Sequence, residues 1–151
     1  MQKGLAGTAL AFAWRRMVLV VDDDSVVRDA VVEALEEAGC AVCCAASLGE
    51  AKRFLGRARP DWILSDLDLD GCDGSEILAV VRGHPEGPPV VFVSARVEER
   101  QRLVALGAED FLPKPFDLDV LLDVSAAWSW PEIVESADDP TEGTSRVGSR
   151  R

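Results

Sequence analysis

Short apolar runs alternate with segments of helical periodicity from Met17 onward. Unbroken apolar runs predict buried strands, and apolar residues three and four positions apart predict helices that bury one face. The predicted strands cover residues 17–22, 41–45, 61–66, 90–93 and 110–112. The predicted helices cover residues 25–38, 47–58, 75–82, 97–106 and 117–128.

Capping and stop signals mark the ends of these helices. Asp24 or Ser25 caps the first helix, and Gly39 follows its last turn. Ser47 and Glu50 form a capping box for the second helix. Residues 67–74 are rich in glycine and aspartate, so we expect a loop between the third strand and the third helix.

The alternation of strands and helices predicts the fold class. Continuous apolar strands separated by helices indicate a parallel sheet that is covered on both faces, with right-handed crossovers. We therefore expect a doubly wound α/β fold with five parallel strands.

The length and composition predict one folded domain. The chain has 151 residues, of which 48% are hydrophobic, enough for a single core. We assign this domain to residues 17–130. Residues 1–16 are expected to be an extension that is disordered or precedes the true start at Met17, and the polar residues 131–151 are expected to be a disordered tail.

Charge and cysteine content narrow the classes of partner. The formal net charge is −11, which argues against direct binding to nucleic acid or to an anionic membrane, since both attract basic surfaces. No apolar stretch reaches the length of a membrane-spanning helix.

The four cysteines do not suggest a disulfide framework in a chain of this size, so we expect reduced thiols and a cytoplasmic protein.

Polar side chains follow four of the predicted strands, at the points where those strands end. In an open parallel sheet, ligands bind beyond the carboxyl ends of the strands, so these residues are expected to form one site. They are Asp22 and Asp23 after the first strand, Asp66 after the third, Ser94 after the fourth and Lys114 after the fifth.

These residue types suit phosphoryl transfer with Mg²⁺. Three converging carboxylates would repel one another, and a divalent cation with hard oxygen ligands removes that repulsion. Lys114 and Ser94 could neutralise and bind phosphoryl oxygens. An aspartate can itself be the nucleophile, and Asp66 is the best placed, because it lies between the other carboxylates and these donors.

The motifs around these residues are similar to those of a known family. VVDDDSVVR, DWILSDLDLDGCDGSEIL, VVFVSA and GAEDFLPKPF occur in an order and spacing that resembles the receiver domain of a two-component response regulator, over residues 17–128. The resemblance implies a flavodoxin-like fold with strand order 2-1-3-4-5. It also implies that Asp66 accepts a phosphoryl group from a histidine kinase or a histidine phosphotransfer protein.

The resemblance assigns further roles. It implies that Asp22, Asp23, Asp66 and the main-chain carbonyl of Asp68 bind Mg²⁺, with Asp23 as the preferred direct ligand of the acidic pair. Lys114 would assist the transfer. Ser94 and Phe111 would form a switch, in which Ser94 follows the phosphoryl group and Phe111 turns inward behind it.

The same resemblance implies a signalling protein that catalyses only its own phosphorylation and dephosphorylation. Phosphorylation would change the surface formed by residues 97–106, 110–112 and 117–128. A downstream protein target would bind there, and a homodimer through that surface is an alternative. A stand-alone regulator and a phosphorelay intermediate both fit this pattern.

Two residues depart from the family's usual pattern. Asp70 stands where the family usually carries proline, and Asp68, two residues after the acceptor, is acidic. We hypothesise that Asp68 pairs with Arg96, two residues after Ser94, and thereby tunes the lifetime of the phosphorylated state.

Two other classes share part of this pattern. Residues 66–77 open like a Ca²⁺-binding EF-hand loop, but the twelfth position is Ile77 rather than glutamate, which lies one residue earlier at Glu76. A phosphatase of the haloacid dehalogenase type also has aspartates spaced like Asp66 and Asp68 after an apolar strand. Its acidic pair, however, follows the nucleophile.

Overall fold

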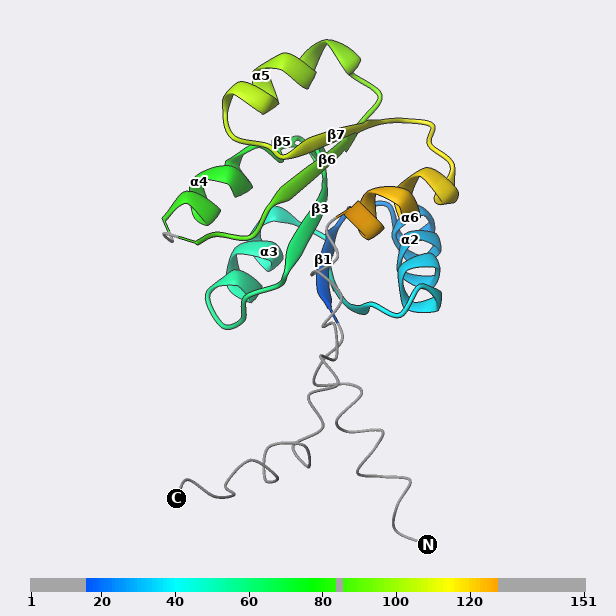
Figure 1. Ribbon diagram of the computed structural model, residues 1–151. Coiled ribbons are helices and arrows are strands. Elements are labelled where there is room, and N and C mark those ends of the chain that lie inside the picture. Colours follow the sequence, from blue (N-terminus) through cyan, green and yellow to red (C-terminus); the bar gives the residue numbers. More distant parts are fainter. Residues whose placement is uncertain (1–15, 84–85, 128–151) are drawn as a thin grey trace, which may run out of the picture.

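The computed structural model describes residues 16–83 and 86–127 of the chain (Figure 1). Its elements, in chain order, are β1 (Met17–Val21), α2 (Ser25–Glu37), β2 (Ala41–Ala45), α3 (Leu48–Leu55), β3 (Trp62–Asp66), β4 (Asp68–Leu69), β5 (Cys72–Asp73), α4 (Glu76–Arg82), β6 (Val90–Ser94), the 3₁₀ helix η1 (Val97–Glu99), α5 (Arg100–Ala105), β7 (Asp110–Pro113) and α6 (Leu118–Ala127).

Five of the strands form one parallel sheet in the order β2-β1-β3-β6-β7. This order is 2-1-3-4-5 when the strands of that sheet are numbered along the chain, so the predicted doubly wound, flavodoxin-like fold is confirmed. The central strands β3 and β6 are buried along their whole length, as their unbroken apolar sequences predict.

Helices cover both faces of the sheet (Figure 1). On one face, Val31 and Leu35 of α2 and Leu121 of α6 pack against strand residues that include Val20 and Trp62. The other face carries α3, α4 and α5, and its core is a second apolar cluster. The sheet is therefore held between two helical layers, and its carboxyl edge is left for the loops.

Asp24 is the cap of α2. Its carboxylate accepts the main-chain N–H groups of Val26 at 3.0 Å and Val27 at 3.4 Å. At α3, the N–H of Glu50 donates to the Ser47 hydroxyl at 3.1 Å, as in a capping box. The Glu50 carboxylate, however, accepts the N–H of Ala46 rather than that of Ser47.

Three predicted segments differ from the structure by more than one residue at an end or in kind. The helix predicted over 47–58 ends at Leu55. Gly56 follows it, and the N–H of Arg57 donates to the Phe54 carbonyl, which closes a tighter turn than that of an α-helix. The helix predicted over 97–106 is divided into η1 and α5. The loop predicted over 67–74 contains the antiparallel hairpin β4–β5.

The two predicted terminal segments, residues 1–16 and 131–151, lie outside the described residues except for Arg16, so their predicted disorder stays a prediction. Within residues 16–83 and 86–127, no helix is both long enough and apolar enough to cross a bilayer.

Candidate functional site

The register of the sheet aligns the ends of its strands. Val21 pairs with Ser65, Asp66 pairs with Val93, and Ser94 pairs with Pro113. The residues that follow these strand ends therefore meet at the carboxyl edge of the sheet, as the order of the motifs predicts.

Three carboxylates form the acidic part of the site. Asp22, Asp23 and Asp66 each place an oxygen within 4.8 Å of the others. Asp22 and Asp66 are buried, with 6% and 8% of their surfaces exposed, whereas Asp23 is exposed. The cluster thus has two buried carboxylates and one that faces solvent. A cation can reach the cluster from the solvent-facing side.

Both oxygens of Asp66 have hydrogen-bond donors. Its Oδ1 accepts the main-chain N–H of Asp68 at 3.1 Å, and its Oδ2 accepts the ammonium of Lys114 at 3.0 Å. Lys114 Nζ is also 3.9 Å from Asp22 Oδ2. One ammonium therefore lies close to two buried carboxylates. Its hydrogen bond to Asp66 orients that carboxylate before any ligand binds.

Burial and charge shift the pKa values of two groups in this cluster. Burial raises the pKa of Asp22 above its usual value, and the charges of Asp66 and Asp23 raise it further, against the N–H of Asp24 and the ammonium of Lys114. For Lys114, burial lowers the pKa, but the hydrogen bond and charge of Asp66 outweigh burial and leave the pKa raised. The ammonium of Lys114 is thus the form favoured in the site.

The acidic cluster fits a Mg²⁺ ion. Its three carboxylates are hard oxygen donors, and Lys114 offsets only part of their charge. Mg²⁺ binds through a few carboxylates while keeping several water molecules, which suits a site that is open on the Asp23 side.

Ser94 lies at the carboxyl end of β6, whereas Phe111 lies within the neighbouring strand β7. The Ser94 hydroxyl is buried and accepts the main-chain N–H of Arg96 at 3.0 Å. The main-chain N–H of Lys114 donates to the Ser94 carbonyl at 2.9 Å, which ties β6 to the segment after β7. The ring of Phe111 is buried in the core cluster beneath α5.

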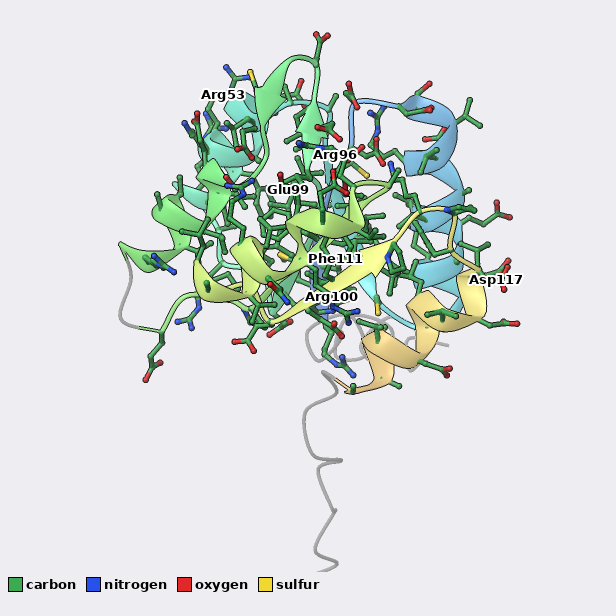
Figure 2. The ribbon with its side chains drawn as sticks, turned by 90° about the horizontal axis from the view of Figure 1, so that it is seen from above. Arg53, Arg96, Glu99, Arg100, Phe111 and Asp117 are labelled. Atoms are coloured by element: carbon green, nitrogen blue, oxygen red, sulfur yellow. The ribbon has the colours of Figure 1, made fainter. Side chains whose placement is uncertain are left out.

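The hypothesised pair of Asp68 and Arg96 is in contact. Arg96 Nη2 donates to Asp68 Oδ1 at 2.7 Å, and Arg96 Nη1 lies 3.6 Å from Glu99 Oε1. Figure 2 shows Arg96, which precedes η1, beside Glu99, the last residue of η1. The pair connects the segment after Asp66 with the segment after Ser94.

This pair belongs to a larger set of charges that the sequence did not reveal. Glu99 also pairs with Arg102 of α5, and Arg102 Nη2 lies 3.4 Å from Asp73 Oδ2 on β5. Asp73 is directly opposite Asp68 in the β4–β5 hairpin. The five residues, which we call the charge ring, join the hairpin to η1 and α5; they are Asp68, Arg96, Glu99, Arg102 and Asp73.

The family is shown by comparison with known proteins. The family model described as response regulator receiver domain matches residues 18–126. The chain belongs to this family. As a receiver domain it is similar to the response regulator MprA of Mycobacterium tuberculosis, with 36% identity over 107 residues, which is 70% of this chain and 46% of MprA.

Solved receiver structures have the same fold. The chemotaxis response regulator CheY4 of Vibrio cholerae aligns with a TM-score of 0.71 and 31% identity, covering 76% of this chain and 99% of CheY4. The receiver domain of NtrX from Brucella abortus aligns with a TM-score of 0.68 and 32% identity, covering 74% and 96% of the two chains. This receiver domain spans about half the length of the curated relatives that it matches.

The structure and the family disfavour the two alternative classes. Asp66 ends a fully buried strand where an EF-hand requires a helix, and Ile77 is buried in the core. Glu76 lies on the surface with Lys52 at 3.2 Å. The haloacid dehalogenase alternative belongs to a different family from the one that matches residues 18–126.

Proposed function

We propose that this receiver domain takes a phosphoryl group from a phosphohistidine onto Asp66, with Mg²⁺ held by Asp22, Asp23, Asp66 and the main-chain carbonyl of Asp68. The observation that carries the proposal is the convergence on Asp66 of an acidic pair within 4.8 Å and an ammonium at 3.0 Å.

The transfer is a displacement at phosphorus. A carboxylate oxygen of Asp66 forms the new P–O bond as the P–N bond to the donor imidazole breaks, and the imidazole keeps the bonding electron pair and takes up a proton. Mg²⁺ would neutralise charge on the phosphoryl oxygens. Lys114 holds Asp66 in place and lies ready to bind one of these oxygens, and the Ser94 hydroxyl lies ready to donate to another.

The partner that delivers the phosphoryl group is a histidine kinase or a histidine phosphotransfer protein. An apolar groove of about 550 Å³ beside Lys114 supports this part of the proposal. Two large apolar side chains on it are solvent-exposed, Val26 of α2 at 76% and Leu118 of α6 at 41%. A helix that carries a phosphohistidine could bury them while presenting its imidazole to Asp66.

The output surface is the face formed by η1, α5, β7 and α6. On phosphorylation, Ser94 would move toward the phosphoryl group and Phe111 would turn further inward, so that this face changes shape. Val104 and Val120 are half-exposed on α5 and α6, which suits a downstream protein target or a second copy of this chain.

Incubation with acetyl phosphate and Mg²⁺, followed by intact mass measurement, tests the function. We expect the parent and an Asp29→Ala control, which removes an exposed carboxylate of α2, to gain one phosphoryl group. Asp66→Ala should gain none, and EDTA should prevent the gain in the parent. A phosphorylated Asp66→Ala protein, or an unmodified parent, would overturn the proposal.

A further inference from the structure

The β4–β5 hairpin turns tightly at the edge of the site. Its two turn residues, Asp70 and Gly71, have φ angles of 48° and 78°. Two consecutive residues with positive φ are what a two-residue type I′ hairpin turn requires, and Asp-Gly is a preferred sequence for it. Glycine takes this conformation freely, and aspartate tolerates it better than most residues.

This turn brings a main-chain donor onto the acidic cluster. The N–H of Asp70 donates to Asp23 Oδ2 at 3.0 Å, across 47 residues of sequence. Asp23 is the exposed carboxylate of the cluster, and an exposed aspartate side chain otherwise samples several rotamers. The hydrogen bond selects the orientation in which Asp23 lies within 4.8 Å of Asp22 and Asp66.

The contact depends on the residue type at position 70. Proline, which the family usually carries there, has no N–H to donate and fixes φ near −65°. It could neither make this bond nor adopt the observed φ of 48°. The departure at Asp70 therefore gives this chain a donor that proline could not supply.

The hairpin that carries this donor is fixed at its base. The N–H of Gly74 donates to the Leu67 carbonyl at 2.6 Å, which closes the loop. A Cβ added at Gly74 would lie 2.3 Å from the Asp66 carbonyl oxygen, so the chain here packs directly on the acceptor. The ion pairs of Arg96 and Arg102 hold the two strands of the hairpin from the α5 side.

We propose that the main-chain N–H of Asp70 is a positioning group for Asp23 and thereby sets the Mg²⁺ affinity of the site. The inference rests on the proposed function, since it takes the acidic cluster to be the Mg²⁺ site. Groups that hydrogen-bond a metal ligand commonly change metal affinity by one to two orders of magnitude when they are lost, because they fix the ligand's orientation.

Titration of the ¹⁵N-labelled full chain with MgCl₂, followed through its backbone amide shifts, tests the inference. We expect Asp70→Pro to bind Mg²⁺ about tenfold more weakly than the parent. Asp70→Asn keeps the N–H, tolerates positive φ and removes the side-chain charge, so its affinity should stay within about twofold. Equal affinity in the parent and Asp70→Pro, or an equal loss in Asp70→Asn, would overturn the inference.

Hydrogen exchange gives a second test that does not require Asp70→Pro to fold. In EDTA, the Asp70 amide should exchange at least about tenfold faster in Asp23→Ala than in the parent, because its acceptor is gone. The Gly74 amide, which bonds to Leu67, is the internal control and should be unchanged. An unchanged Asp70 amide would overturn the inference. Failure of the proposed function looks different, since the parent itself would then neither bind Mg²⁺ nor accept phosphate.

Discussion

At the scale of single residues, Asp22 is a carboxylate whose charged form the folded protein disfavours. It is 6% exposed and lies beside two other carboxylates. The hydrogen bond from the N–H of Asp24, at 2.9 Å, and the ammonium of Lys114, at 3.9 Å, only partly compensate for this burial and repulsion. Such a residue is expected in a site built for a cation, where ligand binding rather than folding satisfies the charge.

Replacing Asp22 by asparagine should stabilise the metal-free domain. Asparagine keeps the size and an oxygen for the Asp24 N–H but removes one of the three clustered charges. We expect the free energy of unfolding at pH 7 in EDTA to rise by about 1 kcal/mol, measured by urea denaturation. Unchanged or lower stability in Asp22→Asn would contradict this account of the site.

The effect of Asp22 should also depend on pH in a defined direction. Its pKa is raised in the folded state, so the folded protein binds the proton more tightly than the unfolded chain. The contribution of Asp22 to stability is therefore fully present below its unfolded pKa and is lost as the pH rises through its folded pKa. The stability difference between parent and Asp22→Asn should shrink as the pH falls through that window. A difference that is constant with pH would exclude this titration as its cause.

The ion pair of Asp68 and Arg96 should lengthen the life of the phosphorylated state. It joins the two segments that follow Asp66 and Ser94, and would therefore hinder the approach of water to the acyl phosphate of the proposed function. An exposed ion pair contributes up to about 1 kcal/mol, so Asp68→Asn and Arg96→Ala should each hydrolyse about two- to fivefold faster. The measurement is loss of label from phosphorylated protein in Mg²⁺. Unchanged rates in both variants would end the hypothesis.

The positions of the site residues could be predicted because each ends or directly follows a strand of the parallel sheet, where the fold leaves little choice of position. Asp22, Asp66 and Lys114 are examples. The contact from Asp70 to Asp23 could not, because it depends on the turn geometry of a hairpin and not on spacing in the sequence.

At the scale of elements, the charge ring makes the hairpin and the start of α5 one unit. Asp68 and Asp73 face each other across the hairpin, and like charges in that position are destabilising. Arg96 and Arg102 pair with one aspartate each, and Glu99 lies between the two arginines. The loop after the acceptor is thus tied to the helix that begins the proposed output surface.

A change far from the phosphoryl group should therefore alter its lifetime. Arg102→Gln opens the charge ring at α5 and should speed dephosphorylation by about twofold, with a smaller effect at high salt because Arg102 and Asp73 are exposed. Arg100→Gln removes the same charge from the same helix outside the ring and serves as the control. Equal rates for the two variants would show that the ring does not transmit to the site.

The cap of α2 gives a prediction about stability alone. Asp24→Ala removes the acceptor of two main-chain N–H groups and should lower the free energy of unfolding by about 1 kcal/mol. Asp29→Ala removes the same charge from the body of the helix and should change it much less. A similar loss in both would mean that charge, and not capping, is responsible.

The elements show where reasoning from the sequence succeeds and where it stops. Unbroken apolar runs predicted all five strands of the sheet. The central strands β3 and β6 are buried along their whole length, and a strand that is buried on both faces tolerates few polar residues. The β4–β5 hairpin was predicted as a loop, although Asp70-Gly71 between Leu69 and Cys72 carried the signal of a type I′ turn. The 3₁₀ turn before α5 leaves no distinct mark in the periodicity.

At the scale of the whole molecule, Mg²⁺ should stabilise the native domain by mass action. At a concentration tenfold above its Kd, a ligand that binds only the folded state adds about 1.4 kcal/mol to the free energy of unfolding. We expect this gain for the parent and its loss in Asp23→Asn, by urea denaturation with and without MgCl₂. Superimposable curves for the parent would contradict a Mg²⁺ site at the acidic cluster, and a response to micromolar Ca²⁺ alone would favour the calcium-binding alternative.

The charge ring has a consequence for how such a protein can diversify. Its side chains at positions 73, 99 and 102 touch neither the acceptor nor the acidic pair, and they lie toward the outside of the molecule. On the proposed function, substitutions there would change the lifetime of the phosphorylated state and leave the residues of phosphoryl transfer unchanged. Receiver domains with longer and shorter phosphorylated lifetimes could then arise from one fold through substitutions at these outer positions.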